Sequence, residues 1–407
     1  ATVFAGGFEK NIFFSGRYSG VGGAAAAIVS GPEAMYWNPA GLVTKAGKQE
    51  MTFDLSPTQS QFSGTFPNGP GEVKSDHATT SPGGIFYNYG LNDKVGLGFG
   101  FYTVAGAYVK YKDVNMGNSF QTLRPTITND LAVYELAAGA GYKVNDQLKL
   151  GAAWRISTAR ANLQSGKLTY SGATPVALAG VDIKNLKGTE VTGFRLGAQY
   201  QPMEHLDIGL DIRTEVNFTT KGQASAQIQT LSSPTTITYL TDTDATVKTS
   251  APMQISLGAG YDVMPQLKIL GEYVFTQYSK VDSIKVEGSL SNGSALGNID
   301  LNFKDMTNIR IGGEYTGYAL PIRAGYVYTS TVTNEGYARP TFTPPGPAHT
   351  FVVGTGYGMM DNKLKLDGGL EMTTFKATVS NVAQADTSTG DYSAKAYALH
   401  LGATYEF

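Results

Sequence analysis

The sequence predicts an all-β protein, a transmembrane antiparallel β-barrel of 14 strands with an N-terminal plug inside the lumen. Three observations lead to this prediction. Apolar and polar residues alternate with the period of two of a β-strand in segment after segment. Short turn signals alternate with long polar connections along the chain. The composition is rich in glycine and aromatic residues, with 50 Gly, 24 Tyr and 19 Phe among 407 residues, which favours strands over helices.

The composition also excludes several classes of protein. Because 31 basic and 33 acidic residues leave a formal net charge of −2, there is no basic excess for binding nucleic acid. The absence of Cys excludes disulfide scaffolds and thiolate metal sites. No charge-free apolar stretch reaches the ~20 residues of a membrane-spanning helix. The chain starts at Ala1 instead of Met, so we expect that a leader was removed during export.

The first 46 residues differ from the rest, because they are dominated by small residues and do not alternate. Tyr36 and Trp37 are bulky anchors, and Pro39 restricts the residue before it to an extended conformation. We therefore predict two parts, a compact plug over residues 1–46 and a barrel over residues 47–407. A disordered export remnant is the alternative for the first part.

Strand-like alternation is clearest in six segments of the barrel. In the last of them, Tyr397, Leu399 and Leu401 alternate with small and polar residues up to the terminal Phe407. The same period of two appears near residues 95–101, 148–156, 206–213, 253–261 and 364–372. Each of these segments is therefore predicted to have one apolar and one polar face.

The connections set the strand count. Six tight turns are predicted near residues 91–94, 145–147, 202–205, 264–266, 319–321 and 361–363. Seven long loops are predicted near residues 67–78, 113–128, 164–189, 222–248, 287–304, 335–347 and 381–393. Thirteen connections imply fourteen strands, with tight turns on the periplasmic side and long loops outside, as in bacterial outer-membrane barrels. A soluble β-sandwich would also alternate and is the alternative fold.

The polar faces of these strands carry charges of both signs. In a barrel such residues point into the lumen, where opposite charges can pair. The predicted inward set is Lys149, Arg155, Arg195, Asp211, Glu272, Arg310, Glu314, Arg323 and Glu371.

Two motifs of the N-terminal segment carry a family resemblance. Gly16-Arg17-Tyr18-Ser19-Gly20, followed by Asn38-Pro39-Ala40-Gly41-Leu42, resembles the hatch of the FadL-type outer-membrane long-chain fatty-acid and aromatic-hydrocarbon transporter family. Later segments, including Phe194-Arg195-Leu196-Gly197, resemble the strands of that family in order. Where the family usually carries hatch acids, this chain has Val21 and Gly31, with Glu33 nearby. We therefore expect fewer ion pairs between hatch and wall.

The resemblance implies a bacterial outer-membrane channel for the passive uptake of fatty acids or hydrocarbons, and not an enzyme. Its partners would be hydrophobic small molecules and membrane lipid or detergent, with no nucleic acid, and it would act as a monomer without a cofactor or a metal. The four His residues show no metal-ligand spacing, although a barrel hydrolase with Ser, His and Asp on separate strands would not be visible from spacing. A structural or adhesive, lipid-binding barrel that does not transport is the alternative function.

The resemblance also implies a gate in the third strand, where the family has a kink that opens the barrel sideways. Tyr102 lies at this place, and Gly100 and Gly106 suit a break in strand pairing. By resemblance, Asn38, Pro39 and Ala40 of the hatch lie against this gap. A plain strand with small inward residues is the alternative.

The expected ligand contacts lie on one strand and two predicted loops. Arg160 matches a basic residue that contacts the ligand carboxylate in fatty-acid-transporting relatives, but strict alternation from Trp154 would turn it outward, where it would meet lipid headgroups. Apolar patches around Leu178 and Val181, and at Tyr239 and Leu240, would form an outer capture groove, or would pack on each other.

Overall fold

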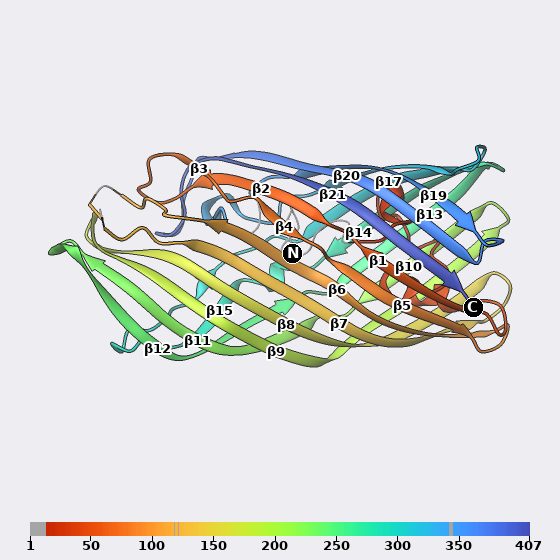
Figure 1. The fold of residues 1–407 in the computed structure, drawn as a ribbon, viewed down its shortest axis with the longest axis horizontal. Coiled ribbons are helices and arrows are strands. Elements are labelled where there is room, and N and C mark those ends of the chain that lie inside the picture. The colour runs from red at the N-terminus through yellow and green to blue at the C-terminus, as the bar shows by residue number, and fades with distance from the viewer. Residues whose placement is uncertain (1–13, 118, 121, 342–344) are drawn as a thin grey trace.

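A computed structural model describes residues 14–117, 119–120, 122–341 and 345–407. The chain forms a single closed antiparallel barrel of 14 strands, as predicted (Figure 1). Several wall strands are interrupted, so that 21 segments make up the wall. Two further 3-10 turns, η3 (Tyr278–Lys280) and η4 (Glu335–Tyr337), lie in connections.

In chain order, the wall begins with an interrupted strand, β1 (Gln49–Leu55) with β2 (Thr58–Thr65), and a second made of β3 (Glu72–Lys74), β4 (Ala78–Thr80) and β5 (Gly83–Gly90). Strands three to six are β6 (Val95–Tyr111), β7 (Ile127–Lys143), β8 (Leu148–Ser171) and β9 (Thr174–Met203). The next four are β10 (Leu206–Arg213) with β11 (Val216–Thr230), β12 (Ser233–Ala251) with β13 (Gln254–Met264), β14 (Leu267–Thr276) with β15 (Ser283–Gly288), and β16 (Ile299–Asp300) with β17 (Met306–Tyr315). The last four are β18 (Ile322–Thr329), β19 (Ala348–Met359), β20 (Leu364–Val379) and β21 (Gly390–Glu406).

The barrel closes between its first and last strands. β1 pairs with β21 over six residues, from Glu50↔Glu406 to Leu55↔Leu401. Closure gives the backbone groups of both strands a partner, which a strand edge in hydrocarbon would lack. Among the described residues, no helix is both long and apolar enough to cross a membrane.

Two of the predicted long loops are strands. Residues 164–189 belong to β8 and β9, which continue to a tight turn at Gly172, and residues 222–248 belong to β11 and β12. These stretches look like loops because they are rich in Ser, Thr and Gly, although Leu168, Leu178 and Ile183 among them are buried. Beyond the apolar belt, however, backbone pairing with the neighbouring strand is enough to continue the hairpin, as at Leu168↔Leu178. The strand count does not change.

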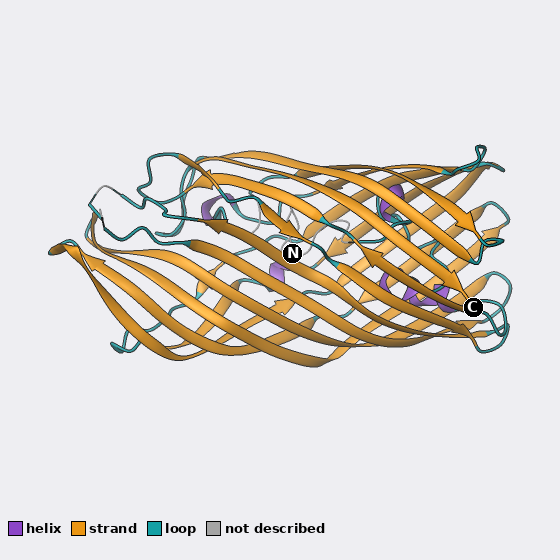
Figure 2. Cartoon of the chain, in the orientation of Figure 1, coloured by secondary structure: helices purple, strands orange, loops and turns teal. Residues whose placement is uncertain are grey.

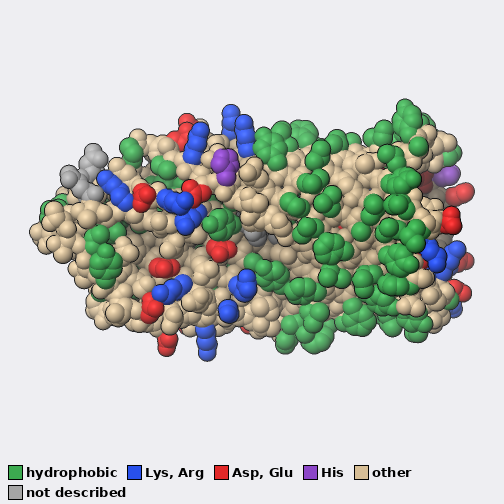
Figure 3. All heavy atoms as spheres, in the orientation of Figure 1, with side chains coloured by type: hydrophobic (Ala, Val, Ile, Leu, Met, Phe, Trp, Pro, Cys, Tyr) green, Lys and Arg blue, Asp and Glu red, His purple; other side chains and the backbone are tan. Residues whose placement is uncertain are grey.

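The outer surface divides into two zones along the barrel. Hydrophobic side chains cover the half nearer the C-terminus and the tight turns, whereas charged side chains gather on the other half (Figure 3). The apolar zone includes large side chains about half exposed, such as Phe99, Trp154, Phe194, Leu257, Ile311 and Leu370. Such a surface would be unfavourable in water and is suited to lipid.

The lumen holds the predicted charges in pairs. Arg155 contacts Glu135 at 2.5 Å, Arg310 contacts Glu272 at 2.8 Å, and Arg323 contacts Asp367 at 2.6 Å. Most of these side chains are at least nine-tenths buried. The prediction that mixed charges pair inside the barrel is confirmed, and pairing is what makes their burial tolerable.

Residues 14–46 pack inside the barrel at the tight-turn end, with three short helical segments, η1 (Ser19–Val21), α1 (Ala34–Trp37) and η2 (Pro39–Leu42) (Figure 2). Wall side chains hold the backbone of this segment, which we call the hatch. Arg310 donates to the Gly23 carbonyl at 2.8 Å, and the Ala26 N–H donates to Glu272 Oε2 at 2.8 Å. Gln199 and Asn88 donate to the carbonyls of Val29 and Leu42. Charged and amide groups of the wall therefore fix the hatch largely through its main chain. Residues 1–13 of the predicted plug lie outside the described residues.

Asn38 is the most connected side chain of the hatch. Its Nδ2 lies 2.8 Å from the Ala26 carbonyl and 3.0 Å from the Ala198 carbonyl of β9, and its Oδ1 accepts from the Ala40 N–H at 3.1 Å, capping η2. The wall residue beside Asn38 is Gly197, and a larger residue would not fit there, because its Cβ would lie 2.0 Å from Asn38 Oδ1. Asn38 thus joins two turns of the hatch to the wall.

We expect Asn38→Ala to loosen the hatch. The change removes the amide bonds to the Ala26 and Ala198 carbonyls, each worth about 0.5–1.5 kcal/mol, and removes the cap of η2. The melting temperature should fall, and the ion conductance of single barrels in planar bilayers should rise. Asn308→Ala is the control, because Asn308 is equally buried but bonds Thr329 across β17 and β18. A conductance no higher for Asn38→Ala than for this control would contradict the role of Asn38.

Candidate functional site

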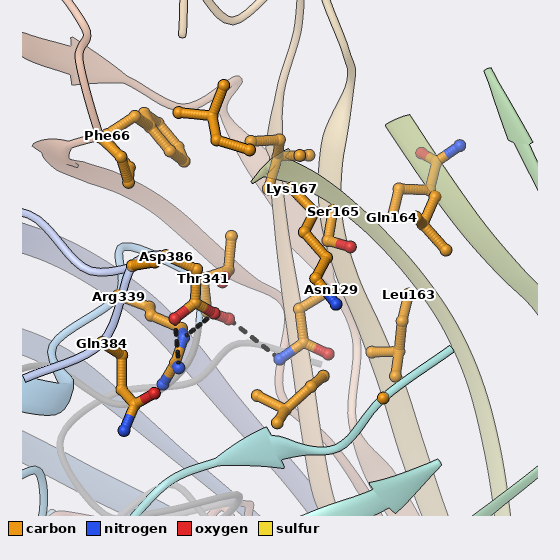
Figure 4. Close-up of a pocket in the computed structure, with 18 of the residues that line it drawn as sticks. Phe66, Asn129, Leu163, Gln164, Ser165, Lys167, Arg339, Thr341, Gln384 and Asp386 are labelled. Carbon is orange, nitrogen blue, oxygen red and sulfur yellow. Dashed lines mark hydrogen bonds and ion pairs between the residues drawn. The ribbon is translucent and has the colours of Figure 1, made fainter. Parts of the chain in front are cut away.

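A cavity of about 290 Å³ lies in the barrel half away from the tight turns (Figure 4). Its apolar lining comes from the inner faces of β7, β8, β9 and β15 and from connections above them: Phe66, Met116, Ile127, Leu163, Leu168, Val181, Ile183, Val286, Leu296 and Ile299. Segments far apart in the sequence, including residues 339–341 and 384–386, complete the wall. The cavity is concave, largely apolar and large enough for a small ligand.

The polar groups in the cavity wall are bonded mainly to one another. Arg339 forms a bidentate pair with Asp386, Nε to Oδ2 at 2.8 Å and Nη2 to Oδ1 at 2.7 Å, and its Nη1 donates to the Asp300 carbonyl. Asn129 donates to the Thr341 carbonyl at 2.9 Å (Figure 4). The Arg339 charge is thereby balanced within the wall, and the remaining charges of the lining are one of each sign, on the exposed Lys167 and Asp300.

The structure places the expected ligand residues in different surroundings. Val181 lines the cavity, and Leu178 is fully buried in the hydrophobic cluster beside it. Tyr239 is 70% exposed near the tip of the β11–β12 hairpin, and Leu240 follows it there, so neither lines the cavity. Arg160 points outward, as strict alternation required, with its guanidinium 5.6 Å from the ring centre of Tyr134.

Sequence reasoning did not identify Asn129, Arg339 or Asp386 as cavity residues. Arg339 and Asp386 lie in connections with no regular pattern, and only the folded chain brings them together. The sequence shows only that one long connection contains a basic residue and another an acidic one. Many such pairs exist in the sequence, so this could not identify the cavity residues.

The third strand contains an irregularity close to the predicted kink. The ladder between β5 and β6 runs from Gly90↔Gly96 to Gly84↔Tyr102. On the other side, the register of β6 with β7 shifts between Thr103 and Ala105, so that Val104 is an extra residue. Beyond Tyr102, Thr103 Oγ1 donates to the Gly83 carbonyl at 3.4 Å, and the next backbone bond between these strands is from the Asp76 N–H to the Lys110 carbonyl, at 2.8 Å.

The residues predicted for the gate lie in two groups. Tyr102 borders the bulge, whereas Gly100 lies in regular pairing with Phe86 and Ala137, and Gly106 pairs with Ala132 beyond the bulge. Asn38, Pro39 and Ala40 do not lie against it. They sit against β8 and β9, where a Cβ at Gly151 would be 2.2 Å from the Pro39 carbonyl carbon.

Aromatic side chains connect the hatch with the strand around the bulge. Phe86 and Tyr102 of the wall stack at 5.3 Å between ring centres, and Phe14 of the hatch stacks on Phe86 at 5.7 Å. Tyr36 meets Tyr102 edge-on at 5.5 Å. These rings belong to one buried apolar cluster with Val104 and Ala105. The inner side of the bulge therefore carries aromatic and aliphatic side chains that rest on hatch residues, beside the buried Glu135 opposite Tyr102 and Arg195 over the Tyr36 ring.

Glu33 is the one acid of the hatch in the described residues, and it is buried. Loss of hydration raises the pKa of Glu33 from 4.5 to about 7. The nearby Asp367 charge raises this pKa further, whereas hydrogen bonds to Ser15 and Asp54 and the Arg17 charge lower it. The Glu33 and Asp54 carboxyl groups can hydrogen-bond to each other only when one of them carries a proton. Burial therefore favours the neutral form of Glu33 at this contact between hatch and wall.

Comparisons with known proteins agree with the fold. Residues 2–407 match the family model described as outer membrane protein transport protein (OMPP1/FadL/TodX). The structure is similar to that of a Pseudomonas aeruginosa FadL homologue, with a TM-score of 0.79, 17% identity and coverage of 98% of this chain and 99% of the other. It is also similar to the CymD monoaromatic hydrocarbon channel, with a TM-score of 0.74, 16% identity and coverage of 98% and 99%.

The Pseudomonas putida toluene transporter TodX gives a TM-score of 0.72 at 19% identity, with coverage of 98% and 99%. Among curated protein sequences none matches. At these identities the structural likeness establishes the fold alone.

We expect the stability of the wild-type protein to fall as the pH rises. A buried acid with a raised pKa takes up a proton on folding, so the stability it gives is fully present below pH 4.5 and is lost as the pH rises through about 7. Glu33→Gln keeps the shape of the side chain but cannot ionise. The melting temperature of this variant should therefore decline less than that of wild type between about pH 5 and 8, and the difference should correspond to about one titrating group. Glu204→Gln, at an exposed turn, is the control. Equal slopes for Glu33→Gln and wild type would contradict the buried proton.

Proposed function

Because the chain belongs to the outer-membrane transport protein family that includes FadL and TodX, we propose that it takes up small hydrophobic compounds by passive diffusion. The observation that carries this proposal is the apolar cavity in the outer half of a barrel whose inner half is filled by the hatch. The family consists of transport channels, and the proposal includes no catalytic step.

The cavity favours neutral ligands. A cavity of about 150 Å³ lined by aliphatic and aromatic side chains is large enough for benzene, so about 290 Å³ suits a substituted single ring or a short hydrocarbon. Arg339 is held by Asp386 and two backbone carbonyls, so it offers little to a ligand carboxylate. Monoaromatic hydrocarbons therefore fit better than long-chain fatty acids.

The exit that we propose is lateral, at the bulge of β6. Among the described residues, the backbone ladder of β6 with the second strand ends at Tyr102, and beyond it Thr103 Oγ1 donates to the Gly83 carbonyl at 3.4 Å. Pro82 of the second strand lacks an N–H to donate. The aromatic cluster of Phe86, Tyr102 and Tyr36 would provide an apolar surface next to this break. A hydrophobic molecule could then pass from the lumen into lipid without crossing a polar layer.

We expect Val181→Trp to fill part of the cavity and to weaken binding of toluene by about tenfold or more, since an overfilled site must displace packed neighbours. Binding to purified protein can be followed by calorimetry. Tyr239→Ala removes a large exposed ring outside the cavity and should leave the affinity unchanged. Toluene should bind more tightly than benzoate, and a preference for benzoate would contradict a neutral site.

Deletion of Val104 tests the exit. Removing the extra residue lets β6 and β7 pair in one register, so the strand should straighten and the break should narrow. We expect uptake of toluene into cells to fall by at least about tenfold, with normal surface expression. Val104→Ala keeps the residue count and should transport normally. Normal uptake by a deletion variant whose strand is shown to be regular would exclude the lateral route.

A further inference from the structure

Three cations lie side by side on the outer wall. Arg160 of β8 is directly opposite Lys187 of β9, and Lys187 is in turn directly opposite Lys221 of β11. Residues opposite each other in a sheet point to the same face, and all three side chains are exposed. We call these three residues the cation row.

The cation row lacks acidic partners. Nearby lysines are paired, Lys184 with Asp242 at 2.8 Å and Lys248 with Glu287 at 2.5 Å. By contrast, none of the three forms an ion pair with a carboxylate of the described residues. Like charges directly opposite in a sheet are destabilising. Without a bound anion, this arrangement would therefore work against the hairpin that carries it.

A polar groove of about 210 Å³ accompanies the cation row. Arg160 and Lys187 line it together with Asn162, Asn185 and Asp130. The groove forms where the pairing of β8 with β9 shifts register between Ala161 and Leu163, and where Asn185 adopts a positive φ of 57°. Asp130 is the acid in this groove, and it accepts from the Asn162 amide at 3.3 Å. Two cations thus face one carboxylate that already has a donor.

The cation row lies just beyond the apolar belt. On the same faces of β8 and β9, the exposed Trp154 and Phe194 come first, then Thr158 bonded to Thr189 at 3.0 Å, and then Arg160 and Lys187. Tyr134, under the Arg160 guanidinium, stacks on Phe101 of the belt. Aromatic residues followed by cations mark the transition from hydrocarbon to headgroups. The cation row is therefore at the depth of lipid phosphates.

We propose that the cation row binds the phosphate groups of the phosphorylated glycolipid, lipid A, in the outer leaflet. A phosphate can accept a bidentate pair from Arg160 and a further bond from a lysine, and it cancels the repulsion along the row. The proposal rests on the orientation in which the extended hairpins face outward, and it is independent of what the channel transports. It assigns Arg160 to the membrane and not to the transported ligand.

Native mass spectrometry of the full chain in detergent tests the site. The probes are bisphosphorylated lipid A, its dephosphorylated form, phosphatidylglycerol and inorganic phosphate. Wild type should bind the bisphosphorylated form about tenfold or more tightly than the dephosphorylated form. The variant Arg160→Gln/Lys187→Gln/Lys221→Gln should lose this preference. Its control, Lys45→Gln/Lys94→Gln/Lys363→Gln, has the same charge change at exposed positions of the tight-turn end and should keep it.

Three results would overturn the proposal. The first is a failure of the variants to differ. An unchanged preference in the cation-row variant would show that the row does not bind the phosphates, and an equal loss in the control would leave only a general charge effect. The second is equally tight binding of phosphatidylglycerol, which would point to any phospholipid. The third is displacement of lipid A by millimolar inorganic phosphate, which would indicate a site for a free anion. Toluene uptake reports separately on the transport proposal and should be normal in both variants.

Discussion

A wall in hydrocarbon has to give each backbone N–H and C=O a partner, and the rest of this structure depends on that constraint. It explains why β1 and β21 pair to close the barrel, and why the wall strands are antiparallel neighbours throughout. The same constraint gives meaning to the place where the pairing of β6 with the second strand ends, because unpaired backbone groups there need another partner. At Val104 the register shifts, and the ladder toward the second strand stops at Tyr102. The buried rings of Phe14 and Tyr36 pack behind that place, so the hatch and the irregular strand form one packed unit.

The lumen meets a different constraint, because charges there are far from bulk water. Arg310 contacts both Glu272 and the Gly23 carbonyl, and Glu272 in turn accepts from the Ala26 N–H. Such buried ion pairs add little net stability but are costly to break one partner at a time. Val21 and Gly31 of the hatch have no charge, yet the hatch is held by these wall groups through its own backbone. A hatch side chain that bonds no wall group, unlike Asn38, can therefore change without releasing the hatch, provided that the wall groups stay.

Much of the fold could be predicted from the sequence, because alternation and turn signals follow directly from strand geometry. The fourteen strands and the paired inward charges are examples. The hairpin extensions at residues 164–189 and 222–248 could not, since their Ser- and Thr-rich faces resemble loops and only pairing with neighbours makes them strands. The cavity was least predictable. Arg339 and Asp386 come from separate connections, and the distance between them exists only after the barrel has closed.

The position of Arg160 shows how strand register keeps a cation on the outer face of the wall and apolar side chains on the inner face at the cavity. The pairing of β7 with β8 runs without a shift from Lys143↔Lys149 to Thr128↔Gln164, so Arg160 must share the outer face of Trp154. A single bulge before it would turn the guanidinium into the lumen. Instead, the cation remains outside with Lys187 and Lys221, and the cavity is lined by apolar groups and a self-balanced ion pair. The register of β8 therefore keeps the inner surface neutral, which is the condition for a hydrophobic ligand to enter it.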